Sequence, residues 1–141
     1  MPLQQQANAV DAAIARLHDG IEYDPRRLAG IGTLAGIGMA DFDQEVTKLG
    51  CTMGLTHGRI TAIELEGLVV DFEGLGVVRF DGQLEIRGDH GPFSSGGDSG
   101  SLIVNPARQA VGLLFAGTDA GVTYANPIDA VLNTLNMELI Q

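Results

Sequence analysis

Short apolar runs separated by glycine-containing joints dominate the sequence from residue 45 to residue 125, and they restrict what the chain can fold into. The runs are rich in Val, Ile and Leu and most are too short for helices, which is typical of strands joined by tight turns. The chain holds 20 Gly among 141 residues. The expected strands occupy residues 45–50, 54–65, 68–72, 75–80, 83–87, 101–104, 109–117 and 121–125. This spacing predicts a single all-β domain, a sandwich or a small barrel.

The last part of the sequence follows a different pattern. Asn126 is a favourable N-cap and Pro127 a favourable first helical residue. From Ile128 to Leu135 the apolar residues recur at helical spacing and mark one face. A C-terminal helix is therefore expected to pack on the β structure.

The composition argues against several classes of partner. The net charge is −10, with 18 acidic and 8 basic side chains, so neither a nucleic acid nor an anionic membrane surface is expected as a partner. No apolar run approaches the roughly 20 residues that a membrane-spanning helix needs, and the first residues do not resemble a signal peptide. Cys51 is the only cysteine, so no intrachain disulfide can form and a reducing compartment fits. We therefore expect a cytoplasmic protein.

No metal or cofactor is expected from the sequence. The three His and the one Cys are scattered, and no pair of them has the spacing of metal ligands. No phosphate-binding glycine loop stands between a strand and a helix.

The turn Gly97-Asp98-Ser99-Gly100-Ser101 stands directly before the apolar strand expected at 101–104. Its glycines allow a tight bend in which backbone N–H groups point outward beside Ser99. Two such donors near one serine are what a tetrahedral oxyanion requires. The turn therefore indicates a nucleophile for acyl transfer, and a turn without chemistry is the alternative. A nucleophilic serine also needs a base to accept its proton.

With this turn, the sequence resembles the second barrel of the trypsin/chymotrypsin-like serine proteases, in the style of disulfide-free bacterial members. The family pattern Gly-Asp-Ser-Gly-(Gly/Ser) is matched at 97–101. Residues 112–117 resemble the substrate-binding strand, residues 121–124 the strand that closes the specificity pocket, and residues 48–58 the opening hairpin. The resemblance covers about residues 45–138. It implies a single antiparallel six-stranded β-barrel, half of a chymotrypsin-like double barrel, with a C-terminal helix.

The resemblance also implies roles for single residues. Ser99 would be the nucleophile that forms the acyl-enzyme, and the N–H groups of Gly97 and Ser99 would form the oxyanion hole. Asp98 would hold the loop through a buried charge contact, whose partner the sequence leaves open. The substrate-binding residues would be Phe93, Ser94, Phe115, Gly117 and Gly121.

The expected substrate preference follows from one position of the pocket. Trypsin-like members with basic specificity place an Asp six residues before the nucleophile, and this chain has Phe93 there. An apolar or small substrate side chain is therefore implied. Asp119, in a loop nearby, could still favour a basic one.

Residues 10–17 allow two interpretations. Apolar residues at helical spacing, from Val10 to Leu17, predict a helix on local pattern alone. The segment also resembles the family's Asp-(Ile/Leu)-Ala-(Leu/Val)-x-x-Leu segment, which is extended and carries the triad Asp. On that interpretation Asp11 orients the catalytic His. Residues 1–17 are then a remnant of the first barrel, 18–44 a connector, and 45–141 the C-terminal barrel with its helix.

The catalytic His has no match in the sequence. In the family it lies upstream of the Asp, in a first-barrel strand, and no such motif is present here. His18 would lie roughly 23 Å from Asp11 on an extended strand. His57 and His90 stand in turn-like contexts. We therefore expect the base to be absent, with His90 as the first local candidate to test.

Three hypotheses remain open. The chain is the C-terminal part of a longer protease and is inactive without its His-bearing N-terminal barrel; or it is a protease-like barrel that serves as a binding or assembly module; or it takes its base from another chain or an unusual local His. A barrel unrelated to proteases is a further alternative. A second barrel without its partner exposes apolar surface, so we expect a homo-oligomer.

Overall fold

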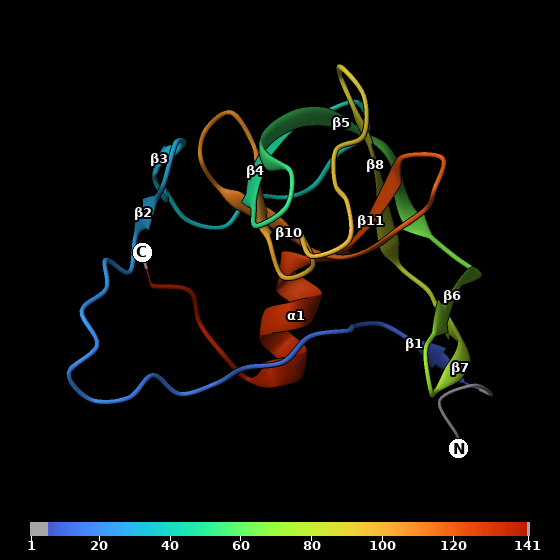
Figure 1. Ribbon diagram of the computed structural model, residues 1–141, viewed down its shortest axis with the longest axis horizontal. Helices are drawn as coiled ribbons and strands as arrows, with labels where there is room; N and C mark the ends of the chain where they lie inside the picture. The colour runs from blue at the N-terminus through green and yellow to red at the C-terminus, as the bar shows by residue number, and fades with distance from the viewer. Residues whose placement is uncertain (1–5, 141) are drawn as a thin grey trace.

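The computed structural model describes residues 6–140, and its centre is a closed antiparallel β-barrel (Figure 1). Six strands close it in the order β10-β11-β8-β5-β4-β9. They are β4 (Glu45–Gly50), β5 (Gly54–Leu65), β8 (Gln83–Gly88), β9 (Leu102–Val104), β10 (Ala110–Gly117) and β11 (Val122–Pro127). The predicted six-stranded all-β barrel is confirmed, and the predicted strands differ from the observed ones only by a residue or two at their ends.

The barrel closes because alternate residues of its strands are apolar and point inward. In β4, Val46 and Lys48 are buried, whereas Glu45 and Leu49 on either side of them are exposed. This is the period of two that a strand imposes on its side chains. The central core contains buried residues from β4, β5, β8, β9, β10 and β11, together with Phe93 of the loop between β8 and β9.

A hairpin stands outside the barrel. It consists of β6 (Leu68–Phe72) and β7 (Gly76–Phe80), and β1 (Ala7–Asn8) pairs with β7 in parallel. The Phe80 ring packs on Phe115 of β10, with 4.9 Å between the ring centroids. This aromatic contact attaches the hairpin to the barrel. Through β1, the hairpin in turn holds the N-terminal segment.

The predicted connector, residues 18–44, has some structure of its own. β2 (Arg27–Leu28) and β3 (Gly32–Thr33) form a short antiparallel ladder. Leu34 follows and is buried in an apolar cluster with residues of β9, β10 and the C-terminal helix. Ile37 then forms an isolated parallel bridge with Ala110. The second half of the connector is therefore packed on the barrel.

The C-terminal helix α1 (Ile128–Leu135) is present, but its N-cap differs from the prediction. Pro127 occupies the N-cap position and no side chain caps the helix, while Asn126 still belongs to β11. Asn126 was predicted as the cap, but its amide is hydrogen-bonded elsewhere. Asn136 ends the helix in the left-handed conformation. Within residues 6–140, no helix has the length and apolar character needed to cross a bilayer.

Residues 9–18 form neither helix nor strand and run as an extended trace from β1 toward β2 (Figure 1). The helix predicted from local spacing is therefore wrong, and the extended form implied by the resemblance is found. An isolated helix of this length is marginal without a surface on which to pack. Ile14 and Leu17, which would have formed its apolar face, are both exposed.

Candidate active site

Ser99 lies in the long loop between β8 and β9, on the tight turn that the sequence predicted. Gly97 and Gly100, on either side, have φ values of 98° and 89°, which favour glycine. A Cβ at residue 97 would also clash with the Thr52 hydroxyl. Ser99 is exposed, and its hydroxyl donates only a long bond of 3.4 Å to the Phe115 carbonyl. Its oxygen is therefore accessible from solvent.

The backbone of this turn leaves two donors free at Ser99. Asp98 N–H donates to the Ser95 carbonyl and Gly100 N–H to the Leu114 carbonyl. In contrast, no acceptor among residues 6–140 takes a hydrogen bond from the N–H of Gly97 or of Ser99. Both predicted oxyanion-hole donors are thus unoccupied beside the hydroxyl. Backbone N–H groups in such a pair can stabilise a developing oxyanion.

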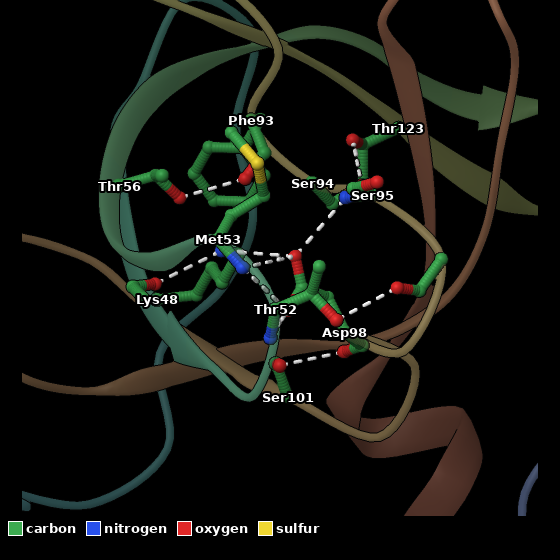
Figure 2. Close-up of polar contacts among 12 residues, drawn as sticks. Lys48, Thr52, Met53, Thr56, Phe93, Ser94, Ser95, Asp98, Ser101 and Thr123 are labelled. Atoms are coloured by element: carbon green, nitrogen blue, oxygen red, sulfur yellow. Dashed lines mark hydrogen bonds and ion pairs between the residues drawn. The ribbon is translucent and has the colours of Figure 1, made fainter.

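A buried ion pair between Lys48 and Asp98 holds the Ser99 turn on the barrel. Figure 2 shows Asp98 surrounded by its partners: the carboxylate accepts N–H bonds from Thr52 at 2.7 Å, Ser95 at 3.0 Å and Met53 at 3.2 Å. Lys48 Nζ lies 3.5 Å from it, and both side chains are completely buried. Burial alone would raise the pKa of Asp98, but the three N–H bonds and the Lys48 charge outweigh it and lower the pKa.

Lys48 is the partner of Asp98 that the sequence left open. Its ammonium also donates to the Gly54 carbonyl at 3.0 Å and lies 5.7 Å from the centre of the Phe93 ring. A signal for it was present in the sequence, because Lys48 shares the inward face of β4 with Val46. A lysine at an inward strand position is expected only where an opposite charge is buried with it.

Two cavities meet at Ser99. The first, of about 480 Å³, is lined by Ser94, Gly117 and Gly121 together with Ser99, so three of the predicted substrate-binding residues lie together. The second, of about 740 Å³, is lined by Ser99, by Phe115 and by Asp11. Both volumes fall in the range of ligand-binding clefts. The nucleophile candidate therefore borders both cavities.

The other two predicted substrate-binding residues lie outside the first cavity. Phe93 is fully buried in the barrel core, and its carbonyl accepts a bond from the Thr56 hydroxyl at 2.7 Å. Phe115 lines the second cavity, and its ring packs on Phe80 of the hairpin. Among residues 6–140, Asp119 is the one charged residue that lines the first cavity, and it is exposed.

Asp11 lies across the second cavity from the barrel, on the extended segment. Its backbone N–H donates to the Asn126 side-chain oxygen at 3.1 Å. No donor among residues 6–140 bonds to its carboxylate, which is exposed. Asp11 therefore lines the same cavity as Ser99, and its exposed carboxylate has no hydrogen-bond partner among residues 6–140.

The three histidines lie elsewhere. His57 is in β5, where its Nδ1 is 2.8 Å from the Thr47 hydroxyl. His18 and His90 are exposed in irregular segments. Within the described chain, no histidine lines either cavity at Ser99. Nor do residues 6–140 contain a group of three or more His, Cys, Asp or Glu that could hold a metal ion.

No family model and no curated protein matches the chain. Solved structures of bacterial serine proteases do resemble it. Cellulomonas bogoriensis chymotrypsin is 24% identical with a TM-score of 0.63, and Thermobifida fusca protease A is 25% identical with a TM-score of 0.64. A glutamic acid-specific serine protease that uses a histidine triad in substrate binding is 22% identical with a TM-score of 0.62.

These similarities extend over most of this chain but only part of the others. They cover 79%, 84% and 89% of this chain, and 58%, 61% and 65% of the three proteases in the same order. The chain thus spans less than two thirds of the length of each. At this level of identity the likeness concerns the fold. The chain has the closed six-stranded barrel and C-terminal helix of the chymotrypsin-like serine proteases.

Proposed function

We propose that this chain is a serine endopeptidase-type domain whose nucleophile is Ser99. The observation that carries the proposal is what meets at one cavity: an accessible Ser99 hydroxyl, the free N–H groups of Gly97 and Ser99 in the same turn, and Asp11 in the cavity lining. The barrel likeness to solved serine proteases supports the same reaction class. A peptide or protein is the substrate.

The reaction assigned to these groups is acyl transfer. Ser99 Oγ attacks the carbonyl carbon of the scissile peptide and gives its proton to a histidine. The carbonyl oxygen becomes an oxyanion and accepts bonds from the N–H groups of Gly97 and Ser99. The histidine returns the proton to the leaving amine, and water then hydrolyses the acyl-enzyme by the same route. Asp11 holds the imidazole in the required tautomer and stabilises its positive charge.

The histidine is the missing group of this arrangement. Because no described histidine lines the cavities, we assign the base to a segment or a chain that packs on the second cavity, as the His-bearing first barrel does in the family. The second cavity has room for such a contribution between Asp11 and Ser99. By itself the 141-residue chain is expected to have negligible peptidase activity, since loss of the base costs about a million-fold in a well-studied case.

The first cavity sets the expected substrate preference. Its lining near Ser99 is formed by small residues, among them Ser94, Gly117 and Gly121. The Ser94 and Thr123 hydroxyls are 2.6 Å apart and bonded to each other. A small or apolar substrate side chain is the class that this lining accepts best. Asp119, at the exposed side of the cavity, would add a modest attraction for a basic one.

Labelling by a fluorophosphonate tests the proposal, because this probe requires an activated serine. The isolated chain should react slowly, and a diffusible base such as imidazole should accelerate the reaction. Mass spectrometry should place the label on Ser99, and Ser99→Ala should abolish it. Asp11→Asn should reduce the imidazole-dependent rate, since the carboxylate no longer orients the added base.

The matched controls are the local histidines. His18→Ala, His57→Ala and His90→Ala should leave the rate of labelling unchanged. Rapid labelling without imidazole that disappears in His90→Ala would instead assign the base to His90. Labelling that stays at background in all conditions would contradict the protease proposal.

A binding or assembly module is the second candidate function, and the position of the histidines favours it. A cavity of about 740 Å³ without a base can hold a peptide but cannot cleave it. The hairpin also exposes apolar side chains, including Val69 (56%) and Val77 (51%). Such surface is often covered by a partner or by a second copy. Sedimentation would show a homo-oligomer if this surface pairs with itself, and a monomer at high concentration would exclude that.

A further inference from the structure

Two fully buried amide side chains link the Asp11 segment to the barrel. Gln83 begins β8 and Asn126 lies near the end of β11, and the two strands pair with Leu84 opposite Ala125. Asn126 Nδ2 donates to Gln83 Oε1 at 2.6 Å. Both residues have no exposed surface. A polar pair buried this completely is costly unless its hydrogen bonds are satisfied.

Of the remaining bonds of this pair, two go to the N-terminal segment and one goes to the residue after β7. Gln83 Nε2 donates to the carbonyl of Ala9 at 2.8 Å and to that of Asp81, also at 2.8 Å. Asn126 Oδ1 accepts the N–H of Asp11 at 3.1 Å. The order of donors and acceptors is fixed along this chain of bonds. Reversing either amide would bring donor against donor or acceptor against acceptor.

Beyond Asp11 the segment has no comparable attachment. Within residues 6–140, the hydrogen bonds of residues 12–25 join only residues close in sequence, none beyond Arg27. Before Asp11, β1 and the bond from Asp81 N–H to the Asn8 carbonyl hold the chain on the hairpin. The bond from the Asp11 N–H to Asn126 is therefore the last hydrogen bond to the barrel before residues 12–25, which make none to it.

We infer that Gln83 and Asn126 are positioning residues, which act as a tether that keeps Asp11 at the Ser99 cavity. The role for catalysis rests on the proposed function of Asp11, whereas the tether itself does not. Because the bond is made to the backbone of Asp11, its carboxylate stays free for a histidine. Because Asn126 is in turn oriented by Gln83, a change at Gln83 is transmitted to Asp11 without a direct contact.

Amide hydrogen exchange of the 141-residue chain, read residue by residue by NMR, tests the tether. In Asn126→Ala the Asp11 amide should exchange at least tenfold faster than in the unmodified chain. Gln83→Met should have the same effect through loss of the orienting bond. The double variant should exchange no faster than either single one, because both changes break the same chain of bonds. Amides of β4 and β5 serve as the reference for global unfolding.

A second Asn–Gln pair, whose Gln109 is half-buried, provides the control. Asn105 Nδ2 donates to Gln109 Oε1 at 3.0 Å, and Asn105 is also buried, but this pair lies in the turn between β9 and β10. Asn105→Ala should therefore leave exchange at Asp11 unchanged. In the imidazole-dependent labelling described above, Asn126→Ala should lower the rate at Ser99 at least tenfold and Asn105→Ala should not.

Two results would overturn the inference. One is an Asp11 amide that is unprotected in the unmodified chain. The other is exchange at Asp11 that rises in Asn126→Ala only together with that of β4 and β5, which would indicate a general loss of stability. Exchange at Asp11 does not depend on any reaction at Ser99. Failure of the tether and failure of the protease proposal are therefore observed separately.

Discussion

The two halves of the candidate site are built in opposite ways. The Ser99 turn is held from inside the barrel, where the buried Lys48–Asp98 pair and three backbone N–H bonds fix Asp98 next to Ser99. The Asp11 half is held from outside, on an extended segment whose last bond to the barrel is a single N–H to Asn126. One half is therefore part of the folded core and the other is attached to its surface.

This difference shows where the site can still change. The groups that would stabilise an oxyanion are fixed before any substrate arrives, as electrostatic preorganisation requires. Asp11 lines an open cavity, and its carboxylate has no partner for its charge among residues 6–140. A histidine supplied by another segment or chain would complete the site by packing beside the Asp11 segment. The following predictions test the contrast through the free energy of unfolding, from the largest expected effect to the smallest.

Removal of the buried cation should have the largest effect. Lys48→Ala leaves Asp98 buried without its ion-pair partner, and breaking such a pair typically costs about 3–5 kcal/mol. Urea denaturation should show a loss of this size. Arg59→Ala is the control, because Arg59 pairs with Glu45 at 3.0 Å on the exposed surface, where an ion pair contributes about 1 kcal/mol or less. Equal losses in the two variants would contradict the proposed importance of the buried pair.

The pH dependence of stability should follow from Asp98. Its pKa is lowered in the folded state, so its contribution is fully present above the unfolded pKa, near 4, and is lost as the pH falls through the folded pKa. The Asp98→Asn variant should thus be less stable than the unmodified chain at pH 7 by about 3 kcal/mol, the low end for a broken buried pair. The difference should shrink as the pH falls below about 4.

Asp81 also has a lowered pKa, chiefly because the Gly67 N–H donates to its carboxylate. Asp81 is present both in the unmodified chain and in Asp98→Asn, so its contribution cancels in the difference between their free energies of unfolding. Denaturation at a series of pH values measures this difference. A difference that does not change between pH 7 and pH 3 would show that the Asp98 charge contributes nothing to folding.

Glycine substitutions in the Ser99 turn should give the next largest loss in the free energy of unfolding. Gly97→Ala combines a positive φ with a clash against the Thr52 hydroxyl, whereas Gly100→Ala has a similar φ but open space around its Cβ. The control should cost about 1–2 kcal/mol for the left-handed conformation alone. Gly97→Ala should cost more, and thermal or urea unfolding will measure the excess. If the two variants are equally stable, the Thr52 contact is not restrictive.

The smallest effect is expected at Asp11. Its carboxylate has no hydrogen bond or ion pair within residues 6–140, so Asp11→Asn should change the free energy of unfolding by less than about 0.5 kcal/mol. The same variant is expected to reduce imidazole-dependent labelling of Ser99. A large loss of stability would instead indicate that the carboxylate has a structural partner. Urea denaturation and labelling rates measured on one preparation separate the two cases.

Much of the barrel could be predicted from the sequence because its strands are local patterns. Glycine at the joints and alternation of apolar residues, as around Val46 in β4, specify strand positions almost to the residue. The turn at Ser99 could be predicted for the same reason, since its glycines are required by positive φ values. These signals depend only on residues that are close in sequence.

The contacts that complete the site are not local, and sequence reasoning missed them. Lys48 and Asp98 come from different parts of the barrel, and only the closed sheet brings them together. Asn126 was interpreted as a helix cap because its own neighbours suggest one, whereas tertiary contacts with Gln83 and Asp11 determine its role. The helix predicted at 10–17 failed in the same way, because its apolar residues have no surface to cover.

The closure of the barrel has a consequence for the order in which the protein folds. One neighbour of β4 is β5, which follows it directly, but the other is β9, with Thr47 opposite Val104. β4 and β9 are far apart in the sequence, and pairing over such a separation is entropically unfavourable and slow. During synthesis, β4 therefore lacks one of its two neighbours until β9, the fourth of the six barrel strands in chain order, has been made. The loop that carries Ser99 directly precedes β9, so we expect the order of this loop to depend on the slow pairing of β9 with β4.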